Sequence, residues 1–248
     1  IRENPDYENY KYTCNGKFSK DSTTIHCYGN EVHGEEDLIT SFANSCNSSY
    51  ANIGLTLDAG SFNKTCDSLL FNQPLPYAYG SKQSSFHRKE DASASDIIES
   101  AIGQGETLVT PLHMALVTSA IANNGVLMKP YLIDHVTNVN GDPVESYEPE
   151  MYGTLLTQEE AKTMQTFLQA VVEEGTGRKL KGQSYTAAGK TGSAEFSDLE
   201  DTSHAWFVGY AHQEGKNDIA LAVVVEEAGS GSAYAVPTAK KIFDAYYR

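Results

Sequence analysis

Apolar side chains recur with helical spacing in two parts of the first half of the chain. Between Leu112 and Ile121 they stand three and four residues apart, and Asn123-Asn124-Gly125 follows as a C-terminal cap. We expect this helix to belong to the core and His113 on it to be structural. Residues 36–57 predict a helix, a short break and another helix.

A further helix begins where Thr157 and Glu160 stand in the spacing of a capping box. Its apolar positions reach Val171, and the pattern stops near Gly175. Because two glycines flank one threonine there, we expect residues 175–177 to begin a flexible connection to the strand that follows.

Strand patterns dominate the last third of the chain. Strands are expected at residues 185–196, 206–211 and 219–226, and the last is apolar throughout, which predicts burial on both faces. Residues 237–247 have helical spacing and should pack on the sheet, while Asn140-Gly141-Asp142 predicts a hairpin. Antiparallel strands with helices on their faces make an α+β domain.

The polar first segment predicts loops and short strands over residues 1–35. Cys14 and Cys27 flank an expected hairpin around residues 19–22, so they can face each other across two strands. A disulfide and a pair of reduced thiols are both open on this evidence. Residues 58–100 predict turns mixed with short helices.

Composition excludes several classes of protein. A chain of 248 residues with 40% hydrophobic content fits one large globular domain, and we expect residues 1–248 to form one. A net charge of −15 argues against a nucleic-acid partner, and no apolar run reaches the roughly 20 residues of a membrane span. The four cysteines lack Cys-x-x-Cys spacing, so we expect no metal site and no cofactor.

Candidate chemistry concentrates in the strip Lys190-Thr191-Gly192-Ser193. Such a strip can border a cleft as an edge strand, where Lys190 supplies positive potential and Thr191 donates a hydrogen bond. Gly192 lets a ligand approach the backbone closely. The strip suits a substrate that carries a carboxylate and an amide carbonyl.

A second polar motif, Ser45-Cys46-Asn47, falls in the break between the two helices of residues 36–57. The Ser45 hydroxyl could relay protons, and the Asn47 amide could both donate to and accept from a peptide backbone. Cys46 should point away from the cleft and pack as a small apolar residue.

Together these motifs resemble a known family. Lys190-Thr191-Gly192 and Ser45-Cys46-Asn47 match motifs of the penicillin-binding protein and serine β-lactamase superfamily. Residues 102–115 resemble its loop-to-helix entry, and residues 204–210 resemble the strand after the Lys-Thr-Gly strand. From about Tyr12 to its C-terminus the chain is similar to a monofunctional penicillin-binding protein transpeptidase domain. The resemblance implies an antiparallel sheet covered by helices beside an all-helical region.

One element of the family pattern is absent before Ser45. The family's nucleophile lies in a Ser-x-x-Lys motif, and the only such motif here is Ser61-Phe62-Asn63-Lys64, which follows Ser45 and is interpreted as a chance match. We therefore expect the chain to be the C-terminal portion of a transpeptidase domain, to be inactive alone, and to hold an incomplete sheet.

The resemblance implies a role for each matched residue. Ser45 would shuttle a proton to the leaving amine, Asn47 would bind the substrate amide, and Lys190 would hold the positive potential and the proton network. Thr191 would bind the terminal carboxylate. The backbone N–H of Ser193 would form half of an oxyanion hole beside Gly192.

The implied activity is a peptidoglycan D,D-transpeptidase that cross-links stem peptides ending in D-Ala-D-Ala and is acylated by β-lactams. It implies the extracytoplasmic face of a bacterial cell membrane, an anchor segment outside this chain, and partners in cell-wall synthesis. Two alternatives stay open: a serine β-lactamase or β-lactam sensor domain, and a non-catalytic binding domain of the same fold.

Overall fold

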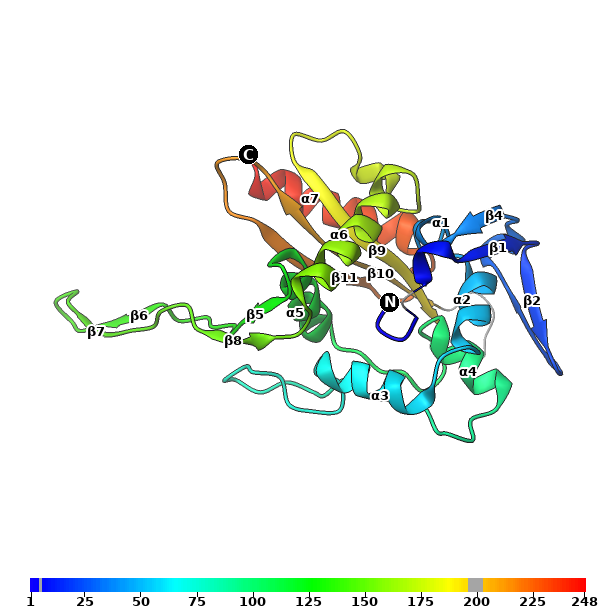
Figure 1. The fold of residues 1–248 in the computed structure, drawn as a ribbon. Helices are drawn as coiled ribbons and strands as arrows, with labels where there is room; N and C mark the ends of the chain where they lie inside the picture. The colour runs from blue at the N-terminus through cyan, green and yellow to red at the C-terminus, as the bar shows by residue number, and fades with distance from the viewer. Residues whose placement is uncertain (5, 196–202) are drawn as a thin grey trace.

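The largest sheet in the computed structural model, which describes residues 1–4, 6–195 and 203–248, is antiparallel with the strand order β11-β10-β9 (Figure 1). Its strands are β9 (Thr186–Glu195), β10 (Ser203–His212) and β11 (Ile219–Val225). All three strands confirm the sequence prediction, although β10 begins earlier than expected and Phe196 lies outside the described residues. The expectation that further strands complete this sheet stays a prediction.

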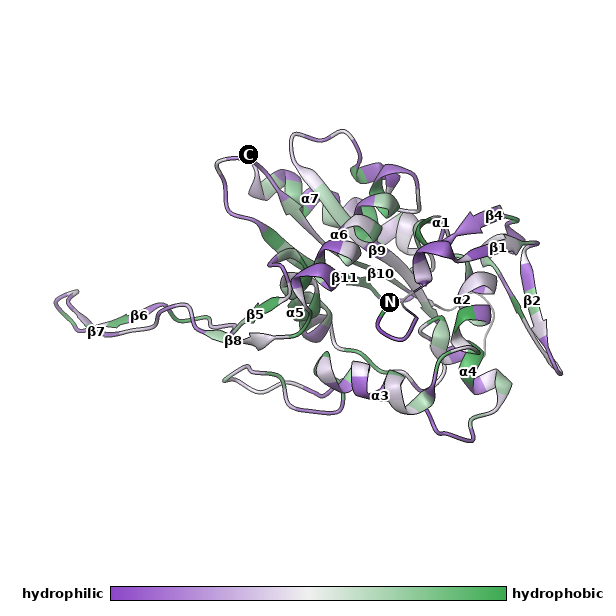
Figure 2. Ribbon diagram, in the orientation of Figure 1, coloured by the Kyte–Doolittle hydropathy of each residue, from purple (hydrophilic) through white to green (hydrophobic). Residues whose placement is uncertain are grey.

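Helices cover both faces of this sheet. Helix α7 (Val236–Tyr246), which follows a π-helix over Gly231–Ala235, packs on one face. Helices α5 (Pro111–Ala122) and α6 (Gln158–Glu173) lie toward the other face, where Figure 2 shows hydrophobic residues along α5 and β11. Alternation along the strands produces this division, because Phe207 joins the α7 cluster while Tyr210 joins the α5 cluster. The α+β prediction is confirmed.

Burial of β11 is less complete than its apolar sequence predicts. Both α5 and α7 contact the strand, yet only Leu221 and Val223 are buried, and its other residues are partly exposed. The reason is its position at the edge of the sheet, where no further strand covers its outer side in the described chain.

Short helices and two-stranded ribbons form the rest of the molecule (Figure 1). The helices are α1 (Leu38–Ala43), α2 (Asn47–Gly54), α3 (Ala59–Ser68) and α4 (Ala94–Ala101), with 3-10 turns at Tyr7–Asn9, Tyr28–Asn30 and Arg178–Leu180. The ribbons pair β1 (Lys11–Cys14) with β4 (Gly34–Asp37), β2 (Lys17–Lys20) with β3 (Thr23–His26), β5 (Val126–Met128) with β8 (Met151–Thr154), and β6 (His135–Thr137) with β7 (Pro143–Ser146). The predicted helix–break–helix of residues 36–57 is confirmed as α1 and α2, and the expected hairpin between Cys14 and Cys27 as β2–β3.

Local sequence signals act as predicted at several element ends. The capping box is present at α6, where the Thr157 hydroxyl accepts from the Glu160 N–H and the Glu160 carboxylate accepts from the Thr157 N–H. The predicted hairpin forms with Gly141 at a φ of 88°, and it extends as β6–β7 away from the body of the molecule (Figure 1). His113 is fully buried with its Nε2 2.6 Å from the Leu69 carbonyl, as a structural histidine would be.

The Gly175–Gly177 segment is not the flexible connection that its sequence predicts. A Cβ at Gly175 would lie 2.1 Å from the Ala43 carbonyl oxygen, and the same oxygen accepts from the Thr176 N–H at 3.1 Å. The Gly177 N–H donates to the Val171 carbonyl. Gly175 is therefore needed for a close approach of the end of α6 to the end of α1.

No described helix, in residues 1–4, 6–195 or 203–248, combines the length and apolarity of a membrane span.

Candidate active site

Lys190 on β9 and Ser45 between α1 and α2 meet in the structure, as the resemblance predicts. The Lys190 Nζ donates to the Ser45 Oγ at 2.8 Å and to the Thr191 carbonyl oxygen at 3.0 Å. Residues that are 145 positions apart in the sequence thus form one hydrogen-bonded pair between the sheet and the helical region.

The surroundings of Lys190 favour its neutral form more than water does. Its Nζ lies 5.6 Å from the centroid of the Phe42 ring, whose face attracts a cation. Burial nevertheless lowers the pKa of Lys190 from 10.5 to about 8. An amine with a pKa near 8 can both hold and release a proton close to neutral pH.

An unusual backbone conformation presents Ser45 to Lys190. Ser45 has a φ of 55°, in the left-handed region that costs a non-glycine residue about 1 kcal/mol or more. Two backbone hydrogen bonds hold the turn, from the Ser45 N–H to the Phe42 carbonyl at 3.1 Å and from the Cys46 N–H to the Ser41 carbonyl at 2.9 Å. The chain thereby reverses between α1 and α2 with the Ser45 hydroxyl toward β9.

The buried carboxylate of Glu36 also supports the turn at Ser45. Glu36, which is 4% exposed, accepts from the Asn44 Nδ2 at 3.0 Å and from the Ser41 Oγ at 3.3 Å. The Ser49 hydroxyl in turn donates to the Ser41 Oγ at 2.8 Å. Because each oxygen of Glu36 has a donor, the buried charge is compensated and the turn is braced.

Asn47 is held by a different partner. It is the first residue of α2, and its Nδ2 donates to the His26 carbonyl oxygen at 3.0 Å. The structure therefore orients the Asn47 amide against the end of β3, and this hydrogen bond does not join it to the Lys190–Ser45 pair.

Thr191 is paired with a residue that the sequence argument did not select. Its Oγ1 lies 2.6 Å from the Thr176 Oγ1, and the residue is only 8% exposed. Thr176 is placed there by the close approach at Gly175. The glycine-threonine-glycine pattern was the sequence signal, but it was interpreted as flexibility.

Gly192 and Ser193 lie on the outer strand of the sheet. A Cβ at Gly192 would lie 3.3 Å from the Trp206 Cβ, and one at Gly231 would lie 2.4 Å from the Gly192 carbonyl oxygen. The Ser193 carbonyl accepts from the Gln104 Nε2 at 3.0 Å, and its Oγ accepts from the Gly231 N–H at 3.3 Å. Since the N–H and C=O of one strand residue point the same way, the Ser193 N–H also faces the open edge.

Ser61-Phe62-Asn63-Lys64, the chance match to the nucleophile motif, lies in the first turns of α3. The Ser61 N–H donates to the Asp58 side chain, which caps that helix. Ser61 and Lys64 line a surface pocket together with Arg2. These partners place the motif at a different site from the Lys190–Ser45 pair.

Cysteine spacing predicted no metal site, but the structure brings Cys14, Cys27, His33 and Cys46 together. The Cys14 and Cys27 sulfurs face each other at 3.7 Å as free thiols. Cys46 is buried in a small cluster, as predicted, and its neighbours there are the sulfurs of the other two cysteines. No local pattern could have revealed this cluster, because its members come from four separate segments.

Comparison with known proteins gives a consistent result. Residues 5–244 match the family model described as penicillin binding protein transpeptidase domain. The chain is 30% identical over 215 residues to penicillin-binding protein 3 of Bacillus subtilis, covering 84% of this chain and 31% of that protein. It is 29% identical over 240 residues to the peptidoglycan D,D-transpeptidase PbpA of Mycolicibacterium smegmatis, covering 92% and 48%.

A solved structure shows the same fold. The crystal structure of the D,D-transpeptidase domain of a peptidoglycan glycosyltransferase from Eggerthella lenta matches with a TM-score of 0.83 at 26% identity. The match covers 96% of this chain and 59% of that one. The chain thus spans 31% to 59% of the length of these three relatives.

Proposed function

We propose that this chain, which belongs to the penicillin-binding protein transpeptidase family, supplies the Ser-x-Asn and Lys-Thr-Gly side of a peptidoglycan D,D-transpeptidase site. The observation that carries the proposal is the 2.8 Å hydrogen bond from Lys190 to Ser45. It unites the two matched motifs around a lysine whose pKa burial lowers to about 8.

In the proposed reaction a serine nucleophile attacks the carbonyl carbon of a D-Ala-D-Ala peptide bond. The carbon–nitrogen bond breaks, an acyl-serine forms, and D-Ala leaves as an amine that must gain a proton. Ser45 delivers that proton through its hydroxyl, and Lys190 replenishes it through their hydrogen bond. The proton that the attacking serine loses returns to this Lys190–Ser45 pair, so the pair ends the step unchanged. The amine of a second stem peptide then takes the acyl group and releases the serine.

Substrate binding would use the outer strand β9. The positive charge of Lys190 and the Thr191–Thr176 hydroxyl pair favour the terminal carboxylate of the donor peptide. The Ser193 N–H, which faces the open edge, would stabilise the oxyanion of the tetrahedral intermediate. Asn47, whose Nδ2 also donates to the His26 carbonyl oxygen, would bind the substrate amide.

β-Lactams carry a similar carboxylate and a strained amide, so the same groups would admit them and form a lasting acyl-serine. The proposed setting is the extracytoplasmic face of a bacterial cell membrane, with an anchor outside residues 1–248 and partners of cell-wall synthesis. We further propose that residues 1–248 form the C-terminal portion of the transpeptidase domain. No Ser-x-x-Lys precedes Ser45, so none of the residues assigned here is the nucleophile.

The test is acylation by penicillin of the protein as its own cells make it, followed by mapping of the modified peptide. We expect one adduct, on a serine other than Ser45 or Ser61. Replacing Lys190 with alanine should slow acylation by roughly 10²- to 10⁴-fold, the usual size of an acid–base contribution. Lys129→Ala, which removes an exposed lysine directly after β5, is the matched control and should leave the rate unchanged.

Several results would contradict the proposal. An adduct on Ser45 or Ser61 would move the nucleophile into this chain. Equal acylation rates for the Lys190→Ala variant and the parent would remove Lys190 from the site. Fast, repeated turnover of a chromogenic cephalosporin would favour a β-lactamase.

A further inference from the structure

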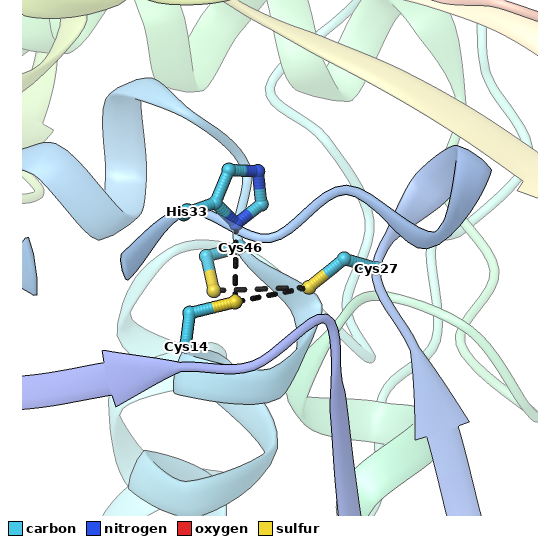
Figure 3. Close-up of side chains that lie close together, drawn as sticks. All are labelled: Cys14, Cys27, His33 and Cys46. Atoms are coloured by element: carbon cyan, nitrogen blue, oxygen red, sulfur yellow. Dashed lines mark hydrogen bonds between the residues drawn. The ribbon is translucent and has the colours of Figure 1, made fainter. Parts of the chain in front are cut away.

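Four metal-binding side chains meet beside the Ser45 turn. Cys14 ends β1, Cys27 follows β3, His33 precedes β4, and Cys46 stands between Ser45 and Asn47 (Figure 3). Their ligand atoms all lie within 4.8 Å of one another. They come from separate segments of the first 46 residues and converge on one point.

The distances fit a tetrahedral ion rather than a disulfide. The Cys27 sulfur lies 3.7 Å from that of Cys14 and 3.8 Å from that of Cys46, and the Cys14 sulfur lies 3.3 Å from the His33 Nδ1. Zinc bonds of about 2.3 Å to sulfur and about 2.0 Å to nitrogen place tetrahedral ligands roughly 3.5–3.8 Å apart. A disulfide would bring two sulfurs to about 2.05 Å.

The neighbours of the cluster suit thiolate and imidazole ligands. The Ser48 hydroxyl lies 3.2 Å, 3.4 Å and 3.3 Å from the sulfurs of Cys14, Cys27 and Cys46, and the Gly16 N–H points to Cys14. The His33 Nε2 lies 3.7 Å from the Glu31 carboxylate. Hydroxyl and amide donors to sulfur, and a carboxylate behind a histidine, are typical surroundings of bound zinc.

Burial further distinguishes the cluster from ordinary cysteines. Cys14 and Cys46 are fully buried, Cys27 is 2% exposed, and the His33 side chain is 10% exposed. Among the residues that the structure describes, Tyr12 is the one partly buried hydrophobic side chain that packs against this cluster. A small apolar core does not require an imidazole nitrogen aimed at its sulfur atoms, whereas here that nitrogen supplies the fourth ligand of a closed metal site.

We propose that Cys14, Cys27, His33 and Cys46 bind one Zn²⁺ ion in a closed structural site. Three sulfur ligands and one nitrogen favour zinc over magnesium or calcium, which prefer oxygen. The ion would join β1, the segment between β3 and β4, and the Ser45–Asn47 turn. Because Cys46 is itself a ligand, zinc would fix the turn that presents Ser45 to Lys190. The site does not depend on the proposed transpeptidase function.

The test begins with the zinc content of the whole protein, purified without chelators and without a metal-affinity step. We expect about one zinc per chain, and all four cysteines of residues 1–248 reacting as thiols after denaturation and metal removal. Titration with a mercurial reagent should release the zinc as the thiols are modified. Replacement by Co²⁺ should give the intense visible bands of tetrahedral cobalt and a sulfur-to-metal absorption in the near ultraviolet.

Variants locate the site. Cys27→Ser and His33→Ala should each lower zinc content well below one per chain, whereas Cys66→Ser should retain it. Cys66 is the matched control because it is a buried cysteine of α3 outside the cluster. If a cluster variant fails to fold, the zinc content and thiol counts of the parent protein and of Cys66→Ser still test the proposal.

Three outcomes would overturn the proposal. Reduced parent protein that takes up no zinc from an equimolar solution would exclude the site. Two missing thiols after denaturation would show a disulfide instead. Zinc that persists at one per chain in folded Cys27→Ser and His33→Ala would place the ion elsewhere.

Discussion

Ser45 and Cys46 are adjacent in the chain, yet their side chains join two different groups of residues. The Ser45 hydroxyl accepts the hydrogen bond of Lys190 at 2.8 Å, whereas the Cys46 sulfur lies 3.8 Å from that of Cys27. The left-handed backbone conformation of Ser45 lets its side chain point toward Lys190 while the side chain of Cys46 points toward Cys27. The turn therefore links the candidate catalytic pair to the cysteine cluster.

The partly buried amine of Lys190 should make the stability of the fold depend on pH. Its pKa is lowered to about 8 in the folded state from 10.5, so between these values the unfolded chain holds a proton that the folded protein has released. The free energy of unfolding attributable to Lys190 therefore rises across that window, by about 3 kcal/mol at most. Denaturant unfolding at pH 7, 9 and 10.5 measures it.

Lys190→Met provides the control for that experiment. The difference in unfolding free energy between the variant and the parent should be largest below pH 8 and should shrink by pH 10.5. A difference that stays constant across this range would show that Lys190 keeps its ordinary pKa.

Gly175→Ala should destabilise the fold sharply. The added methyl group would lie 2.1 Å from the Ala43 carbonyl oxygen, a backbone atom that cannot move without displacing the end of α1. Overpacking of this kind costs typically 1–3 kcal/mol or more, and thermal unfolding should report it as a lower midpoint. Gly153→Ala is the control, because its methyl group would meet nothing within 4 Å. Equal midpoints for the two variants would refute the close approach.

Thr176→Val should weaken the initial binding of penicillin while changing the later acylation step less. The substitution removes the hydroxyl that lies 2.6 Å from Thr191, leaving a buried hydroxyl without its partner. We expect about fivefold weaker binding, which corresponds to the roughly 1 kcal/mol of one hydrogen bond. Rapid-mixing kinetics separate the two steps, and Thr176→Ser should restore binding. Similar losses with valine and serine would exclude the hydroxyl contact.

The ion pair between Arg2 and Glu160 should stabilise the start of α6, and this stabilisation should depend on pH. Its hydrogen bond and charge, with the capping bonds of Thr157, lower the pKa of Glu160 to about 2 from 4.5. Arg2→Ala should cost up to about 1 kcal/mol near pH 7, because both side chains are partly exposed to solvent.

The loss caused by Arg2→Ala should fade as the pH falls from 4.5 toward 2, where Glu160 becomes protonated and the ion pair no longer contributes. Lys181→Ala breaks the more exposed ion pair with Glu173 and should have no measurable effect. Equal unfolding free energies for Arg2→Ala and Lys181→Ala would show that the Arg2–Glu160 pair stabilises the fold no more than the exposed Lys181–Glu173 pair does.

Local signals in the sequence predicted most of the fold correctly. The capping box at Thr157 and the turn at Gly141 depend on residues within a few positions of each other, so their geometry can be inferred directly. The proximity of Ser45 and Lys190 could not be derived in this way. It was expected only because both motifs resemble those of one family.

The remaining features arise from contacts between distant segments. Gly175 suggested flexibility because its tight neighbour, Ala43, belongs to another helix. Thr176 meets Thr191 for the same reason. His33 showed no signal at all, because its role depends on where β1, β3 and α2 place three cysteines.

The buried carboxylate of Glu36 also has an evolutionary consequence. Glu36 accepts from both Ser41 and Asn44, so changing one of the three leaves a buried polar group without its partner. Related sequences should therefore exchange Glu36, Ser41 and Asn44 as a set, and covariation among these positions should exceed that of equally buried neighbours. The Ser-x-Asn turn would thus be inherited together with Glu36, Ser41 and Asn44, the residues that hold it.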